Sequence, residues 1–258
     1  MDVLRRELDR IYASQRLGDE SLGRAPVEEC KGLAASVAAA LGGCAVVTDA
    51  ARDRCCLYAG PLGELLGIGM TGARCREICS SDEDLLYERM HPADLVEKRM
   101  LEYEYFRFVD PLPPAEKTLW HAACRVRLRD REGRYVLLDN TTRVLRPSPA
   151  GKIWLILCCY DLSPLQETRL EGIGARMLHA RSGQVRALSL AQRKGRILTA
   201  REKEVLRLIR HGCLSKQIAD TLGISLNTVN RHRQNILSKL SVANSVEAVT
   251  AALEMGLL

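Results

Sequence analysis

The sequence has no long apolar run, no Cys-x-x-Cys pair and few aromatic residues. Only 4% of its 258 residues are aromatic, although 47% are hydrophobic, which is enough to bury a core. The best candidate for a membrane span, residues 33–47, contains Ser36, Gly42 and Gly43 and is shorter than the about 20 apolar residues that a span needs. Residues 1–7 lack the apolar segment of a signal peptide. We therefore expect a cytoplasmic protein without membrane contact, long enough for two domains.

Ten cysteines are present, but no two of them form a Cys-x-x-Cys pair. They are Cys30, Cys44, Cys55, Cys56, Cys75, Cys79, Cys124, Cys158, Cys159 and Cys213. A disulfide framework is typical of short secreted chains. Cys75 and Cys79, with His91 downstream, are the only arrangement that resembles a metal site, and the second tight pair of a zinc site is missing. The pattern favours buried or reduced thiols and no metal.

Charge is distributed unevenly along the chain, whose net charge is +6. Residues 166–258 contain 15 lysines and arginines and 7 acidic residues, a net charge of +8. Residues 1–165 contain 23 basic and 25 acidic residues, a net charge of −2. A near-neutral region followed by a basic one of domain size indicates a sensor or partner domain joined to a polyanion-binding domain.

The basic region predicts four short helices from Leu198 onwards. Thr199 and Glu202 have the spacing of a capping box. Gly212 and Gly223 end the first two helices, and Ser225 caps the third. The third helix places Asn227, Asn230, Arg231, Gln234 and Ser238 within an arc of about 100°. Two short helices that meet at a glycine, the second presenting Asn, Arg and Gln, are typical of a helix-turn-helix that reads the major groove.

Four sequence blocks resemble the LuxR-type (NarL/FixJ-like) DNA-binding domain. The blocks are Leu198-Thr199-x-Arg201-Glu202-x-Glu204-Val205-Leu206, then Ser215-Lys216-Gln217-Ile218-Ala219, then Leu222-Gly223-Ile224-Ser225, and then Thr228-Val229-x-x-His232-Arg233-x-Asn235-Ile236-Leu237-x-Lys239-Leu240. The resemblance implies an all-α tetrahelical domain over residues 196–258. It also implies that the third helix enters the major groove of double-stranded DNA and that the fourth helix mediates dimerisation.

The position on these helices assigns a role to each candidate residue. We expect base reading by Asn230, Arg231 and Gln234. We expect phosphate contacts from Lys216, Thr228, Arg233 and Lys239, with the stem of Arg233 packed. We expect dimerisation through Val249, Ala252 and Leu253. Leu214 stands where the family often has a capping serine, so the second helix is expected to begin one residue late.

The region before the helices changes from a helical period to a period of two after Trp120. Cys124, Val126 and Leu128 alternate with arginines, residues 130–133 predict a turn, and residues 134–145 and 153–160 predict two more strands. His91 and Pro92 predict a helix start, with His91 in a structural role. Three antiparallel strands at the end of a mixed region indicate an α+β domain.

His91-Pro92-x-Asp94, the hairpin through Glu132-Gly133-Arg134-Tyr135, and the strand that closes with Asp161-Leu162-Ser163 resemble a PAS domain. The resemblance covers residues 33–165 and implies a five-stranded sheet with flanking helices that senses a small-molecule ligand or a partner. No haem or flavin signature is visible, so no cofactor is expected and the ligand stays unnamed. The sequence predicts an N-terminal helical extension over residues 1–32, and a signalling helix with a basic linker over residues 166–195.

These features predict a transcriptional regulator whose PAS-like domain controls a LuxR-type DNA-binding domain. We expect a homodimer on DNA, with RNA polymerase as a further candidate partner. The alternative is a sigma-factor-like protein that binds promoter DNA together with RNA polymerase, although the first half lacks a helical polymerase-binding region. An enzyme is not expected. Asp49, Asp53, His91 and His121 are scattered single residues without a paired acid and base or a phosphate loop.

Overall fold

The sheet domain is built on one antiparallel sheet. The computed structural model describes residues 11, 17, 22–68, 75–81, 83–166, 172–188, 198–240, 242–254 and 257–258. The strands are β1 (Cys44–Asp49), β2 (Arg54–Ala59), β3 (Arg76–Ile78), β4 (Trp120–Arg129), β5 (Tyr135–Pro147), β6 (Ile153–Leu162), β7 (Arg176–His179) and β8 (Val185–Ala187). Their order across the sheet is β3-β2-β1-β6-β5-β4-β7-β8. The three strands expected after Trp120 are therefore confirmed and lie side by side, as β4, β5 and β6.

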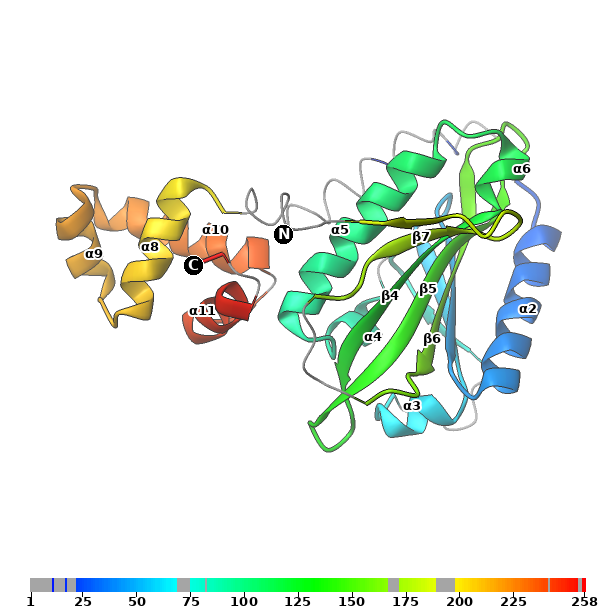
Figure 1. Cartoon of the computed structure of the whole chain (residues 1–258), viewed down its shortest axis with the longest axis horizontal. Helices are drawn as coiled ribbons and strands as arrows, with labels where there is room; N and C mark the ends of the chain where they lie inside the picture. The colour runs from blue at the N-terminus through cyan, green and yellow to red at the C-terminus, as the bar shows by residue number, and fades with distance from the viewer. Residues whose placement is uncertain are drawn as a thin grey trace.

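Helices cover both faces of this sheet, with α2 (Ala25–Leu41) on one side and α5 (Pro92–Val109) on the other (Figure 1). The shorter helices are α3 (Pro61–Leu65), α4 (Asp84–Tyr87) and α6 (Pro114–Lys117). Alternate residues of each strand point to opposite faces, so the sheet contributes to two cores. Val46, Val126 and Ile156 pack on the α5 side, while Val47 and Trp154 pack against α2.

The His-Pro-x-Asp segment begins α5 and fixes it to β4. The backbone N–H of His91 donates to the carbonyl of Arg127 at 2.8 Å, and Pro92 occupies the first turn of the helix. Asp94 accepts from the Arg127 guanidinium at 2.6 and 2.9 Å and from the Arg127 backbone N–H at 2.8 Å. His91 Nδ1 lies 3.2 Å from Arg127 Nη2. The structural role expected of His91 is confirmed.

The segment expected to form a signalling helix instead extends the sheet. Residues 176–187 form the β7–β8 hairpin, and β7 pairs with β4. Gly172 and Gly174 have φ values of +81° and +60°, a backbone conformation that interrupts a right-handed helix. Ile173 and Met177 have helical spacing in the sequence, but both are buried against the sheet. The described part of residues 166–195 thus belongs to the sheet domain, and residues 167–171 and 189–195 lie outside the description.

The N-terminal boundary also differs from the expectation. The boundary predicted between residues 32 and 33 falls inside α2, which packs its buried face on the sheet through Val27, Ala34 and Ala38. The helix expected around Leu4 and Leu8 lies outside the described residues. Among the residues that are described, no single helix is long and apolar enough to cross a membrane, although the bent pair α10 and α11, defined below, together meets the length and composition criterion.

Four helices form the C-terminal domain, as the sequence predicts. They are α8 (Ala200–Arg210), α9 (Ser215–Leu222), α10 (Leu226–Leu240) and α11 (Ser245–Glu254). The capping box is present: Thr199 Oγ1 accepts from Glu202 N–H at 3.2 Å, and Glu202 Oε2 accepts from Thr199 N–H at 2.8 Å. Gly223 ends α9 with a φ of +62°. Helix α9 begins at Ser215, after Leu214 in the N-cap position, which agrees with the expected late start.

Candidate functional site

Helix α10 carries a polar exposed face opposite its buried one. Val229, Ile236 and Leu240 are at most 1% exposed and anchor the helix in the domain core. The side chains of Asn227, Asn230, Arg231 and Gln234 are exposed. The structure therefore brings the three predicted base-reading residues together on one accessible face in the first two-thirds of the helix.

The start of α10 is held firmly. Ser225 Oγ accepts from the backbone N–H of Thr228 at 3.1 Å and lies 2.9 Å from Thr228 Oγ1. An N-cap of this kind contributes about 1 kcal/mol to helix stability. Lys216, at the start of α9, is exposed. The face thus combines groups that pair bidentately with guanine or adenine edges with hydroxyl and ammonium groups suited to phosphate oxygens.

Two of the predicted phosphate contacts have partners inside the domain. The Arg233 guanidinium donates to Ser215 Oγ and to Ser245 Oγ, both at 2.9 Å. It therefore connects the starts of α9 and α11 across α10. The packed stem agrees with the expectation, but both outer nitrogens of the guanidinium bind hydroxyl groups of the domain.

Lys239 makes an ion pair with the carboxylate of the capping box. Its Nζ lies 2.7 Å from Glu202 Oε2, and the two side chains are 19% and 3% exposed. Burial alone would raise the pKa of Glu202, but the hydrogen bonds from Lys239 and from the Thr199 backbone lower it below its ordinary value. Lys239 thus compensates a nearly buried charge at the start of α8, a contact that sequence spacing does not reveal.

The predicted dimerisation surface on α11 needs a correction. Ala252 is fully buried inside the domain, so it offers no surface to a partner. Leu253 is 42% exposed, Val249 is partly buried, and Val246 is 77% exposed. Val246, Val249 and Leu253 recur at helical spacing, so the accessible apolar stripe includes Val246 in place of Ala252.

A second cluster of polar groups lies buried between α5 and the sheet. Lys98 is fully buried. Its Nζ contacts the Glu102 carboxylate and lies 3.3 Å from Thr142 Oγ1. Tyr87 donates to Glu102 at 2.9 Å. Burial alone would lower the pKa of Lys98, but the facing Glu102 carboxylate and the nearby Cys158 raise it, so the ammonium group stays charged.

The cluster continues toward β6 through further buried polar groups. Tyr160 donates to Glu83, whose pKa is raised by burial. Cys158 Sγ lies 3.3 Å from Thr142 Oγ1, and burial raises the pKa of this thiol well above its ordinary value. The sequence pattern does not reveal this cluster, because a Lys and a Glu at i, i+4 in a helix, such as Lys98 and Glu102, are typical of a solvent-exposed pair.

The cysteines are free thiols, and six of them are buried. Cys75 is partly buried and Cys79 is exposed. Within the described ranges, no group of three or more His, Cys, Asp or Glu side chains is arranged to hold a metal ion.

Residues 196–252 match the family model described as "Bacterial regulatory proteins, luxR family". The C-terminal segment is therefore a LuxR-type helix-turn-helix domain. Among curated proteins, YgeK of Escherichia coli K12, an uncharacterized response regulatory protein, is 48% identical over 59 residues, 23% of this chain and 40% of YgeK. The transcriptional activator protein SolR of Ralstonia nicotianae is 33% identical over 114 residues, 42% of this chain and 48% of SolR. The chain thus spans less than half the length of these relatives.

A solved structure of the VqmA dimer of Vibrio cholerae in the absence of target DNA also matches. It is 20% identical, with 86% of each chain covered and a TM-score of 0.30. That score is too low to establish a shared fold over the whole chain.

Proposed function

We propose that the protein is a sequence-specific DNA-binding transcriptional regulator in which the sheet domain controls a LuxR-type reader. One observation carries the proposal: α10 exposes Asn230, Arg231 and Gln234 on one face, within a segment that matches the luxR family. Side chains of these types discriminate base edges in the major groove, each good pair contributing about 1–3 kcal/mol. Helix α10 is thus the recognition helix.

Lys216 and Thr228 flank this face and contact phosphates. Both lie at a helix start, where backbone N–H groups add to the attraction for an anion. Arg233 and Lys239 support the DNA-binding face indirectly, because their cationic groups already bind partners inside the domain. Arg233 binds Ser215 and Ser245, and Lys239 binds Glu202. Their main contribution is to fix α10 relative to α8, α9 and α11.

Dimerisation uses the accessible stripe on α11 formed by Val246, Val249 and Leu253. A homodimer with this contact places two recognition helices on successive half-sites, so the operator is a pseudo-palindrome. An apolar stripe at the surface of an isolated domain is typical of a protein contact.

The sheet domain is PAS-like and receives the input. Five of its strands, β2, β1, β6, β5 and β4, are contiguous and antiparallel, with helices on both faces, as the PAS resemblance implies. The buried polar cluster around Lys98 lies in its α5-side core. A buried ion pair adds little to stability, and ionisable groups held inside a domain often mark a functional site. The domain thus senses a small polar molecule or a partner that changes the packing around α5.

Selection of bound duplexes from a random library by the full-length protein tests the proposal. The expected result is a pseudo-palindromic motif. Arg231→Ala is expected to relax the sequence preference at one base pair of each half-site. Transcription assayed with core RNA polymerase alone separates the sigma-factor alternative, since only a sigma factor would initiate. Enrichment of no motif, or initiation from core polymerase, would contradict the proposal.

A further inference from the structure

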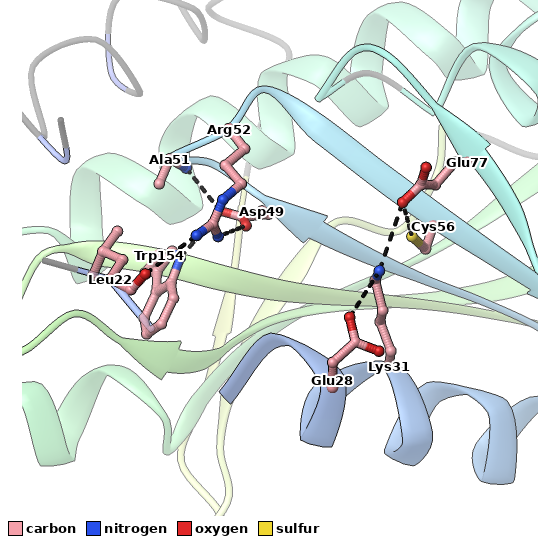
Figure 2. A network of polar contacts seen from close by, with 9 residues as sticks. All are labelled: Leu22, Glu28, Lys31, Asp49, Ala51, Arg52, Cys56, Glu77 and Trp154. Atoms are coloured by element: carbon pink, nitrogen blue, oxygen red, sulfur yellow. Dashed lines mark hydrogen bonds and ion pairs between the residues drawn. The ribbon is translucent and has the colours of Figure 1, made fainter. Parts of the chain in front are cut away.

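A pocket of about 330 Å³ lies on the α2 side of the sheet, away from the buried cluster around Lys98. It lies between the first turns of α2 and strands β1, β2 and β3, and Figure 2 shows the polar contacts that surround it. It is lined by Arg24, Val27, Glu28, Lys31, Val47, Asp49, Arg52, Arg54, Cys56 and Glu77. The volume is at the lower end of the range for small-molecule sites, about 300–1,000 Å³.

The floor of the pocket follows from the strand register. Val47 pairs with Cys56, and Cys56 pairs with Glu77, so these three side chains lie abreast on one face of β1, β2 and β3. Val27 of α2 adds an apolar wall. Burial raises the pKa of the Cys56 thiol to about 11, so this thiol stays neutral. Val27, Val47 and Cys56 therefore form a small apolar surface beside Glu77.

Acidic groups occupy one side of this floor. Glu28 and Glu77 share a single cation, since Lys31 Nζ lies 3.2 Å from Glu28 Oε1 and 3.6 Å from Glu77 Oε1 (Figure 2). Two carboxylates with one ammonium group between them leave one negative charge uncompensated. This side of the pocket favours an additional cation.

Arginines occupy the other side. Asp49 accepts from Arg52 Nη1 at 2.6 Å, from Ala51 N–H at 3.1 Å and from Trp154 Nε1 at 3.0 Å, so its oxygens are engaged (Figure 2). Arg24 and Arg54 also line the pocket and are exposed at its mouth. Asp49 balances the charge of Arg52 alone, which leaves two positive charges on this side for an anion.

We propose that this pocket binds a small zwitterion of the amino-acid class with an aliphatic side chain. Its carboxylate contacts Arg54 and Arg24, its ammonium group contacts Glu77 and Glu28, and its side chain lies on the floor. Arg54 is two residues from Cys56, the strand partner of Glu77, so the two charged rows are about 7 Å apart along the strand. One small zwitterion spans that separation while its two charged groups make hydrogen bonds of ordinary length.

The test compares three probes that share the same aliphatic side chain and differ in their charged groups. They are L-leucine, 4-methylpentanoate, which lacks the ammonium group of leucine, and 3-methylbutylamine, which lacks its carboxylate. Calorimetric titration of the full-length protein is expected to give a Kd of roughly 0.1–1 mM for leucine. Each truncated probe is expected to bind at least about tenfold more weakly. Failure of leucine, isoleucine, valine and methionine to bind at about 10 mM would overturn the proposal, and so would equal binding of a truncated probe.

Two further measurements locate the site. Arg54→Gln is expected to weaken leucine binding at least about tenfold, because it removes an exposed charge that binds the carboxylate. Arg76→Gln on the adjacent β3 is the matched control and should leave binding unchanged, since Arg76 is exposed but does not line the pocket. Leucine should shift the methyl NMR signals of Val27 and Val47. Shifts confined to Val96 and Val126, on the α5 side, would place the ligand elsewhere and refute the assignment.

Discussion

Replacing Lys239 by alanine tests whether this lysine stabilises the C-terminal domain or binds a DNA phosphate. The change removes the ion-pair partner of the Glu202 carboxylate. That carboxylate is 3% exposed and accepts a hydrogen bond from the backbone N–H of Thr199, the N-cap of α8. Loss of one member of a fully buried pair costs about 3–5 kcal/mol. Lys239 is 19% exposed, so water partly replaces the lost contact, and we expect a loss of about 2 kcal/mol. In a domain of this size that loss corresponds to a decrease in Tm of roughly 8–16 °C.

Lys216→Ala is the matched comparison, because Lys216 is exposed at the start of α9. A phosphate contact contributes about one unit to the slope of log K against log salt concentration. We expect Lys216→Ala to lower that slope by about one unit and to leave the Tm of the C-terminal domain unchanged. We expect Lys239→Ala to lower the Tm and to leave the slope unchanged at a temperature where both variants are folded.

Thermal unfolding followed by circular dichroism and DNA binding by fluorescence anisotropy across a salt series give both quantities. A slope lowered by about one unit in Lys239→Ala, with an unchanged Tm, would show that Lys239 binds phosphate. The structural interpretation of the Glu202–Lys239 pair would then be wrong.

Three further predictions concern Glu202, the apolar stripe of α11 and the Lys98–Glu102 pair. The pKa of Glu202 is lower in the folded protein than its ordinary value of 4.5. The contribution of Glu202 to the stability of the domain is therefore complete above pH 4.5 and is lost as the pH falls through the folded pKa. Glu202→Gln should remove this acid dependence from urea unfolding curves. Leu253→Glu should abolish cooperative binding to the second half-site while leaving single half-site binding, whereas Ala252→Glu should unfold the domain, as circular dichroism would show. Lys98→Met should destabilise the sheet domain by about 3 kcal/mol in chemical denaturation and the double variant with Glu102→Leu should restore that loss; equal stability of the single and double variants would contradict a buried ion pair.

The helices of the C-terminal domain were predictable because their signals are local. A capping box, glycines after two helices and a repeating apolar stripe each operate within one turn of helix, and the structure shows each of them. The β4, β5 and β6 strands were predictable for the same reason, since alternation and turn residues are local patterns.

The sequence-based predictions were wrong at two places where tertiary contacts, and not local sequence, determine the structure. Ile173 and Met177 are spaced as on a helix, yet Gly172 and Gly174 adopt positive φ and the segment pairs with β4. Ala252 completes an apolar stripe by spacing, and only the packing of the four helices shows that it faces inward. Small residues and short apolar runs leave such choices to the rest of the fold.

The polar clusters were also hidden from sequence reasoning. Lys98 and Glu102 are buried because distant strands pack against α5, as the contact between Lys98 and Thr142 of β5, 44 residues apart, shows. The pocket of Figure 2 depends on strand pairing that sets Cys56 beside Glu77. No local pattern reports which charged residues a sheet and a helix enclose.

Binding of Arg231→Ala to cognate and scrambled duplexes across a salt series tests most directly whether α10 reads bases. We predict a loss of about 1–3 kcal/mol on the cognate duplex, a relaxed preference at one base pair, and little change on the scrambled duplex. An equal loss on both duplexes would show that Arg231 contacts phosphate only and that α10 does not read sequence through this residue.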